Sequence, residues 1–166
     1  DNTAGPWDGT QEHPYQNITS GLEHASEGDT TYVYNGTYCE NVVVNIRNFS
    51  LIGDDKGTTI IDGNYTGNVV TIIASNVNIT NFTIKNSGTT YLLAGVFAEN
   101  VSDCKIEDNF IANNYCGICL SGASNSLIFG NNITTTHFWG IDLENSSYNN
   151  ITRNNMTNNG GGIRLQ

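Results

Sequence analysis

The sequence of 166 residues predicts an all-β fold: a single-stranded, right-handed parallel β-helix of about five to six coils with a short N-terminal capping helix. A repeat of 22 to 23 residues runs through its second half, and Asn recurs at one fixed phase of that repeat. The composition is that of short strands joined by frequent turns. Helical solenoids have longer repeats and do not tolerate Asn pairs in every repeat, so the period indicates strands.

The repeat is visible as four tetrads that begin with Gly and recur at spacings of 22, 23 and 22 residues. The tetrads begin at Gly95, Gly117, Gly140 and Gly162. Three columns of residues follow the first three glycines at constant distances. They are Ile106, Ile128 and Ile151; Asn109, Asn131 and Asn154; and Ile111, Ile133 and Met156. Because an inward row in a solenoid stacks on the same row of the next coil, these columns are predicted to face the interior.

The composition supports strands upstream of the clear repeat as well. The chain has 26 Asn, 19 Thr and 18 Gly but only 2 Pro. Asn and Gly accept left-handed backbone at tight corners, whereas Thr, Val and Ile favour strands. Seven upstream strands are predicted at 31–34, 41–44, 49–52, 59–62, 69–73, 77–80 and 82–85.

A short amphipathic helix is predicted before the first strand. Ser20 and Glu23 have capping-box spacing, and Ile18 and Leu22 fall on one helical face that would close the first coil. The predicted organisation is an N-terminal arm or leader, a capping helix and a β-helix domain open at its C-terminal end: residues 1–15, 16–28 and 29–166.

The Asn column is predicted to form an inward ladder. Side-chain amides stacked at a corner can bond along the column, and each bond contributes about 1 kcal/mol. The ladder residues are Asn109, Asn131 and Asn154.

Charge restricts the possible partners. The formal net charge is −10 and the pI is near 4.3, with no basic cluster, which argues against nucleic acid and against an anionic membrane surface. No apolar run reaches the roughly 18 residues of a membrane span, so no membrane insertion is predicted. The chain begins at Asp1, which favours an exported, extracellular or cell-surface protein whose signal peptide has been removed.

Three segments of the first half resemble a known family. They read GDTTYVYNGTYCENV (28–42), LIGDD (51–55) and TIIDG (59–63). They are similar to the right-handed parallel β-helix repeat proteins of the NosD-like and pectate-lyase-like superfamily, closest to surface proteins of methanogenic archaea. That resemblance implies the fold over residues 16–166 and leaves the function open, since its members include polysaccharide lyases, hydrolases and epimerases, a copper-site maturation factor and structural surface proteins.

No catalytic residue, metal site or cofactor is predicted. Pectate lyases would need a calcium-binding carboxylate cluster with a basic residue, and polygalacturonase-like hydrolases would need clustered Asp residues with a His. His137 stands alone in the coils and is interpreted as a solvated surface group. The acids of the later coils are interpreted as a solvated face, with calcium or acid/base chemistry as the alternative. These acids are Glu99, Asp103, Glu107, Asp108, Asp142 and Glu144. The stretch at 36–40 is expected to set a turn and the next strand.

The four cysteines are predicted to form disulfides, because an even count is typical of exported proteins. They are Cys39, Cys104, Cys116 and Cys119, and their pairing is left open. The C-x-x-C at 116–119 lacks the context of a thioredoxin-like or zinc site. Free or metal-bound thiols are the alternative.

Glycosylation sequons are twice as frequent as the roughly five that chance placement gives. The eleven are Asn17, Asn35, Asn48, Asn64, Asn78, Asn81, Asn100, Asn132, Asn145, Asn150 and Asn155. In three of them the middle residue belongs to an inward position, so strand alternation turns the Asn outward. N-linked glycans are therefore predicted at several sites, although packing preferences of the repeat could create such triplets too.

An aromatic group at the corner before the repeat Gly is a further candidate. Tyr115, Phe138 and Trp139 could form a sugar platform or a subunit contact, with corner packing as the alternative.

The predicted function is that of a non-enzymatic structural protein of a cell-surface layer, sheath or filament. Subunits would self-assemble head to tail, with Gly162, Ile163 and Leu165 at the contact, because an uncovered solenoid end exposes strand edges and core. The alternative is a carbohydrate-binding or carbohydrate-cleaving module of a larger surface protein.

Overall fold

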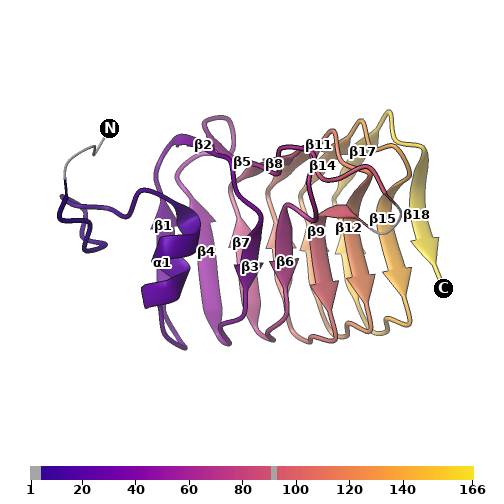
Figure 1. Cartoon of the computed structure of the whole chain (residues 1–166). Coiled ribbons are helices and arrows are strands. Elements are labelled where there is room, and N and C mark those ends of the chain that lie inside the picture. Colours follow the sequence, from indigo (N-terminus) through magenta and orange to yellow (C-terminus); the bar gives the residue numbers. More distant parts are fainter. Residues whose placement is uncertain (1–4, 91–92) are drawn as a thin grey trace.

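The computed structural model of the chain describes residues 5–90 and 93–166. In this part the chain forms one helix, α1, and three parallel sheets of six strands each, which confirms the predicted fold class. Each coil contributes one strand to each sheet, so the solenoid has six coils (Figure 1). We name the sheets A, B and C, and the turns between them the A–B, B–C and C–A corners.

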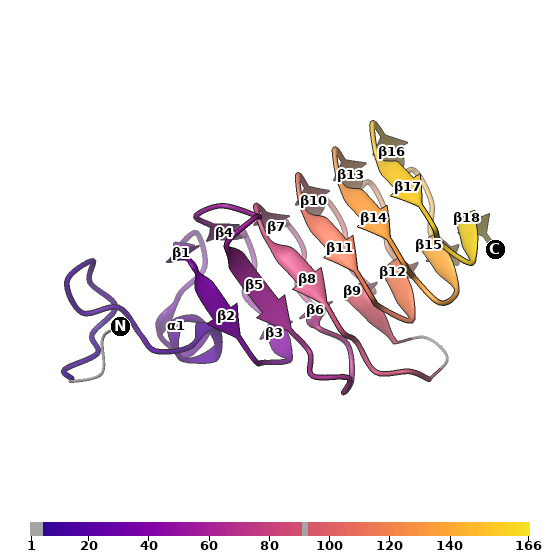
Figure 2. The ribbon, with the colours of Figure 1, turned by 90° about the horizontal axis from the view of Figure 1, so that it is seen from above.

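Each sheet is built from every third strand, and all pairings are parallel. Sheet A contains β1 (Thr30–Val33), β4 (Phe49–Gly53), β7 (Val77–Thr80), β10 (Lys105–Glu107), β13 (Leu127–Phe129) and β16 (Asn150–Thr152). Sheet B contains β2 (Gly36–Tyr38), β5 (Thr59–Asp62), β8 (Thr83–Lys85), β11 (Phe110–Ala112), β14 (Asn132–Thr134) and β17 (Asn155–Thr157). Sheet C contains β3 (Val42–Val44), β6 (Val70–Ile72), β9 (Ala94–Glu99), β12 (Cys116–Ser121), β15 (Trp139–Glu144) and β18 (Gly161–Leu165). Seen from above, the strands of one sheet succeed one another along the axis (Figure 2).

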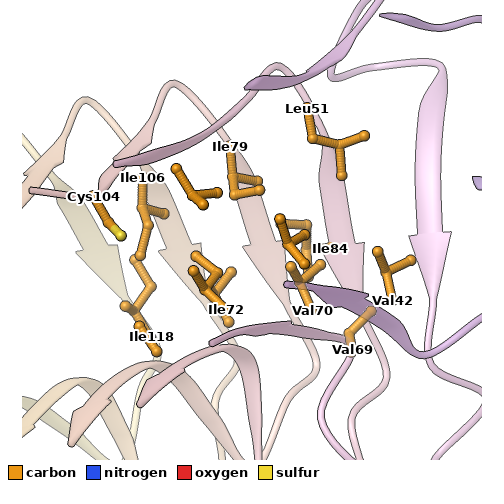
Figure 3. Close-up of a cluster of buried hydrophobic side chains, with 14 of the residues drawn as sticks. Val42, Leu51, Val69, Val70, Ile72, Ile79, Ile84, Cys104, Ile106 and Ile118 are labelled. Carbon is orange, nitrogen blue, oxygen red and sulfur yellow. The ribbon is translucent and has the colours of Figure 1, made fainter. Parts of the chain in front are cut away.

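The core is a stack of inward aliphatic columns, as the repeat predicts. Ile106 is paired with Ile79 on one side and Ile128 on the other, and Ile128 with Ile151. All three sheets send such residues into one continuous interior (Figure 3). Because burying aliphatic side chains is worth roughly 25 cal/mol per Å² of apolar surface, these columns provide the main driving force for the fold.

The corners are made with left-handed backbone, and Asn is the residue most often used there. Ten asparagines of the described chain have φ between 48° and 64°. Asn tolerates this region better than other residues with a Cβ because its short polar side chain can bond locally. The high Asn content is therefore in part a consequence of the number of corners.

The predicted ladder is present at the A–B corner. Asn131 Nδ2 donates to the carbonyl of Ile106 at 2.8 Å and to Asn154 Oδ1 at 2.9 Å, while Asn131 Oδ1 accepts from both nitrogens of Asn109. Asn109 and Asn131 are buried. Their amides are fully used, which removes the cost of burying them.

Helix α1 (Ile18–His24) is shorter than the predicted segment and is capped differently. Asn17, not Ser20, is the N-cap, and its Oδ1 accepts the N–H of Ser20 at 2.7 Å. Glu40 from the turn after β2 accepts the N–H groups of Ile18 and Thr19 at 2.8 and 2.9 Å. The 36–40 stretch thus supplies a strand and an anchor for the helix, which buries Ile18 and Leu22 against the first coil.

The segment before α1 has no helix or strand in its described part, and residues 1–4 of the predicted arm lie outside it. The Tyr15 ring stacks on His24 of α1, with ring centroids 4.7 Å apart. This arm therefore contacts the capping helix of its own chain.

Candidate functional site

A surface depression lies along the B–C corner, and we call it the corner groove. Its volume is about 740 Å³, within the range of ligand sites in proteins. The described residues that line it come from five successive coils. They are Tyr65, Ser87, Thr89, Asn113, Asn114, Tyr115, Thr135, Thr136, His137 and Asn158. The groove therefore runs along the solenoid axis.

The floor of the groove is held by a second inward ladder that the sequence analysis did not identify. Asn114 Oδ1 accepts the N–H of Ser87 at 2.9 Å, and its Nδ2 donates to the carbonyl of Ile84 at 3.1 Å. Asn159 holds Thr136 in the same way, at 3.1 Å from Oδ1 to the backbone nitrogen. Because these contacts link one coil to the next, the groove has a rigid base.

Each of the last three coils presents a left-handed residue to the groove. Asn113, Thr135 and Asn158 all have a φ of 56°. This conformation is unfavourable for β-branched Thr and costs of order 1–3 kcal/mol. The A–B and C–A corners use left-handed residues in the same way, so this backbone belongs to the repeat, and Thr135 is its β-branched member at the groove.

Aromatic rings from two coils gather beside the polar column. The Tyr115 ring lies 5.3 Å from that of His137 and 5.7 Å from that of Phe138, between centroids, and the second pair is stacked. Phe138 is in turn in edge contact with Trp139 at 5.5 Å. Three of these rings are the predicted aromatic group. His137, by contrast, is no isolated surface group, because it lies on Tyr115 and lines the groove.

The groove is almost free of charge although the chain carries a net charge of −10. Its described lining residues include no Asp, Glu, Lys or Arg, and apart from the His137 imidazole they carry hydroxyl, amide and phenol side chains. Such groups act as both donors and acceptors. The groove thus offers neutral hydrogen bonding next to flat apolar rings.

Next to the groove, the outer face of sheet C holds a buried ion pair. Asp142 is 2% exposed, and Arg164 on the next coil donates to its Oδ1 from Nε at 2.8 Å and to its Oδ2 from Nη2. The Arg164 guanidinium also lies over the Trp139 ring, 5.7 Å from the centroid. Asp142 was expected on a solvated acidic face; the structure instead neutralises it in a packed cluster.

The predicted disulfides are not present, because all four cysteines are free. The cysteines lie at three separate places in the fold. Cys39 is exposed in the first coil, and Cys104 is buried in the interior. Cys116 and Cys119 are buried on the outer face of sheet C beside Phe97 and Trp139. Hydrogen bonding between these two thiols, together with burial, raises the pKa of Cys116 far above its usual range, so it stays protonated.

The remaining predicted acids do not come together. Glu99 and Glu144 are in register with Ser121 on sheet C, whereas Glu107 belongs to sheet A and Asp108 to the A–B corner. In the residues that the structure covers, no group of three His, Cys, Asp or Glu could hold a metal ion. This distribution of acids offers neither a calcium site nor a paired carboxylate.

The predicted subunit contact lies on the last strand, β18. Ile163 and Leu165 are 43% and 72% exposed. The eleven sequon asparagines are exposed or half-buried, and none is buried. End-to-end contact and glycan attachment remain predictions.

Comparison with known proteins agrees with the fold. Residues 22–166 match the family described as periplasmic copper-binding protein (NosD). The solved catalytic domain of an α-1,3-glucanase in complex with tetrasaccharides superposes with a TM-score of 0.70 at 17% identity, over 80% of this chain and 26% of that one. The pectin methylesterase of Yersinia enterocolitica gives a TM-score of 0.65 at 16% identity, over 80% of this chain and 54% of that one.

A pectin methylesterase in complex with a hexasaccharide is also similar, with a TM-score of 0.64 and 14% identity over 84% of this chain and 56% of that one. The chain thus spans about a quarter to somewhat more than half of these enzymes, and the likeness concerns the fold alone. None of the curated proteins matches it in sequence. Among the described residues no helix is long and apolar enough to cross a membrane.

Proposed function

Since the chain belongs to the NosD family and shares its fold with enzymes that act on polysaccharides, we propose that it is a carbohydrate-binding β-helix whose ligand lies in the corner groove. The observation that carries the proposal is the position of the Tyr115 ring, which stacks on Phe138, beside a row of uncharged polar side chains along one groove. Aromatic faces pack against the apolar faces of sugar rings, and amides and hydroxyls bond to sugar hydroxyls.

The groove favours a neutral glycan that lies parallel to the solenoid axis. Successive coils are one strand spacing apart, about 4.8 Å, which is close to the length of one hexose unit. The five coils that line the groove are separated by four such spacings and therefore offer room for about four sugar units. An acidic chain would meet a protein of net charge −10 without a basic residue among the described lining residues.

The proposal is for binding and not for cleavage. No Asp or Glu is among the described residues that line the groove. The nearby Asp142 is buried and occupied by Arg164. Acid/base cleavage of a glycosidic bond uses two accessible carboxylates flanking the bond, which this groove does not provide in its described part.

The copper of the family's description does not fit the residues described here. Copper sites use soft or imidazole ligands brought together in space. His13, His24 and His137 lie in the arm, the helix and the groove, and Met156 lies in the last coil. The Cys116 thiol is held protonated in a packed cluster. We therefore assign no role to copper. The family's periplasmic description is in keeping with an exported chain.

Calorimetric titration with glycans tests the proposal. We expect neutral oligosaccharides to bind, with affinity rising up to about four sugar units and little beyond, because longer chains leave the groove. Oligogalacturonides of equal length should bind more weakly. Tyr115→Ala should lower the affinity roughly tenfold, since a stacked ring is removed.

The matched control is Tyr148→Ala, because Tyr148 is 87% exposed at the C–A corner and away from the groove. Its affinity should equal that of the unmodified sequence. Equal losses in both variants, or failure of every neutral glycan to bind, would contradict the proposal. Tight binding that does not depend on chain length would retain sugar binding and reject the axial arrangement.

End-to-end assembly remains a second prediction. It rests on the sequence prediction for β18, while the comparisons favour the carbohydrate function. Electron microscopy of native material would separate the two, since fibres formed without any sugar ligand are expected only from assembly.

A further inference from the structure

The eleven sequons are unevenly distributed over the faces of the solenoid. Sheets A and B carry Asn78, Asn150, Asn132 and Asn155 on their strands. The A–B corner carries Asn35 and Asn81, and the C–A corner carries Asn48, Asn100 and Asn145. Asn17 caps α1, and Asn64 lies in the second coil's B–C loop. No sequon lies on a strand of sheet C or on the B–C corner of the last three coils.

The sequon asparagines also differ from the others in burial. Eight of the eleven are exposed and Asn78, Asn81 and Asn132 are half-buried. The buried asparagines of the described chain are Asn86, Asn109, Asn114 and Asn131, and none of them begins a sequon. The amides that hold the coils together are therefore distinct from those that a modifying enzyme could reach.

The B–C corner of the last three coils lacks sequons although it is rich in Asn. The B–C corner of the last three coils contains Asn113, Asn114, Asn158 and Asn159. Two residues after each of them stands Tyr, Cys or Gly in place of Ser or Thr. The outward column of sheet C, from Val43 to Arg164, contains no Asn in register. Glycans at the sequons would thus leave the groove side of the last three coils uncovered, while Asn64 lies beside the lining residue Tyr65 in the second coil.

We propose that the protein carries N-linked glycans on sheets A and B and on the A–B and C–A corners, and that the outer face of sheet C and the corner groove in the last three coils stay free of them. In the attachment step the amide nitrogen of Asn forms a bond to the anomeric carbon of an oligosaccharide carried on a lipid pyrophosphate. The bond from that carbon to the pyrophosphate oxygen breaks, and the amide proton leaves with the lipid pyrophosphate.

Side-chain contacts rank the sites. Asn17 Oδ1 is used in the helix cap, and Asn48 donates to Glu27 and accepts from Asn76. A glycan on either amide would disturb these bonds. Asn100, Asn145 and Asn150 are exposed on the later coils. We expect high occupancy at these three sites and low occupancy at Asn17, Asn48 and the three half-buried sites.

Peptide mapping of the protein from the organism that produces it tests the proposal. Enzymatic release of glycans in ¹⁸O water converts each modified Asn to labelled Asp, so the occupied positions can be read by mass. Label at Asn100, Asn145 and Asn150 is the expected result. Absence of label from all eleven sites, or label confined to Asn17 and Asn48, would overturn it.

A variant tests whether sugar binding requires the groove to be free of glycans. Tyr115→Thr creates an N-x-T triplet at the exposed Asn113 of the groove, and Tyr115→Val is the matched control without a triplet. Produced in a glycosylating secretory host, the first variant should gain a glycan and lose sugar binding further than the control. A glycan on Asn113 without additional loss of binding would reject the groove as the ligand site and leave the glycan map intact.

Discussion

The A–B and B–C corners use the same chemistry in two ways. At the A–B corner the ladder residues Asn109 and Asn131 face inward, and their amide groups bond to neighbouring coils. At the B–C corner an inward amide is followed at once by an outward ring or imidazole, as in Asn114 and Tyr115. The exposed residues of the first corner include the charged Asp55, Asp108 and Arg153. The second has a rigid base and a mostly uncharged outer row, which lines the corner groove in its described part.

The difference shows how a repeat fold can form a ligand site at one of its corners. Positions that bond between coils must keep a side chain that can bond inward, so they build the fold. Positions that point outward can vary from coil to coil. The extra residue of the fifth coil, which makes the spacing 23 in place of 22, lies at the B–C corner and places Phe138 between His137 and Trp139.

The largest effect is expected from removing the central ladder residue. Asn131→Ala leaves the carbonyl of Ile106 and two donors of Asn109 without partners in the interior. Each orphaned group costs roughly 1–3 kcal/mol, so we expect a loss of about 4 kcal/mol in the free energy of unfolding. Urea denaturation would measure it.

The control is the neighbouring Asn132→Ala, which removes an outward side chain with one long contact of 3.4 Å to Asn155. Its effect should stay below about 0.5 kcal/mol. Similar losses in the two variants would contradict the inward ladder as a stabilising element.

A backbone contact at the start of sheet C gives the second effect. A Cβ on Gly117 would lie 2.3 Å from the carbonyl oxygen of Gly140 and 2.5 Å from Ile133 Cγ2. Gly117→Ala should therefore destabilise the protein by roughly 3 kcal/mol, the upper end of overpacking costs. Gly162→Ala, at the same phase of the last coil, meets nothing within 4 Å and should be neutral. Thermal unfolding of both variants would decide whether close packing between neighbouring coils is the reason for glycine at the first position of the tetrads.

Most of the fold could be predicted from the sequence because the period, the Ile columns and the Asn109 column report inward positions directly. The second ladder could not, because its phase is occupied by Ser87, Asn114, Thr136 and Asn159 in turn, which share a position but not a residue type. The contribution of Glu40, which accepts the N–H groups of Ile18 and Thr19, could not be predicted because Glu40 is distant from the helix in sequence.

The groove was only partly predictable for a related reason. Its rings at Tyr115 and Phe138 stand next to the repeat Gly and were recognised as a group. Tyr65 and Thr89 come from irregular coils, so no column connects them to the rest. The burial of Asp142 depends on Arg164 one coil later, which charge counting along the chain does not show.

Relief of strain at the groove should have a smaller and opposite effect. Thr135 is the β-branched member of a column in which Asn113 and Asn158 share its φ of 56°. Thr135→Asn should stabilise the protein by about 1 kcal/mol, because Asn accepts left-handed backbone more readily. The measurement is the unfolding midpoint in urea, with Thr134→Asn on the adjacent strand as the control. A stabilised variant with weaker sugar binding would show that Thr135 itself contacts the ligand.

The smallest effect concerns the first coil that reaches the groove. Asp62 ends β5 and accepts hydrogen bonds from the Asn64 N–H at 3.0 Å and from Asn86 Nδ2 at 2.9 Å, with Lys85 Nζ 3.3 Å away. Burial alone would raise the pKa of this carboxyl, but the bonds from Asn64 and Asn86 and the Lys85 charge outweigh it and lower the pKa below 3.8. The ionised form is thus favoured by folding, so the stabilisation is present above the unfolded value near 3.9 and is lost as pH falls through the lower folded value. Because the pair is partly exposed, the contribution should be below about 1 kcal/mol. The free energy of unfolding, measured in urea between pH 2 and 6, should fall less steeply with decreasing pH for Asp62→Asn than for the unmodified sequence. Parallel curves would show that Asp62 does not stabilise the B–C corner.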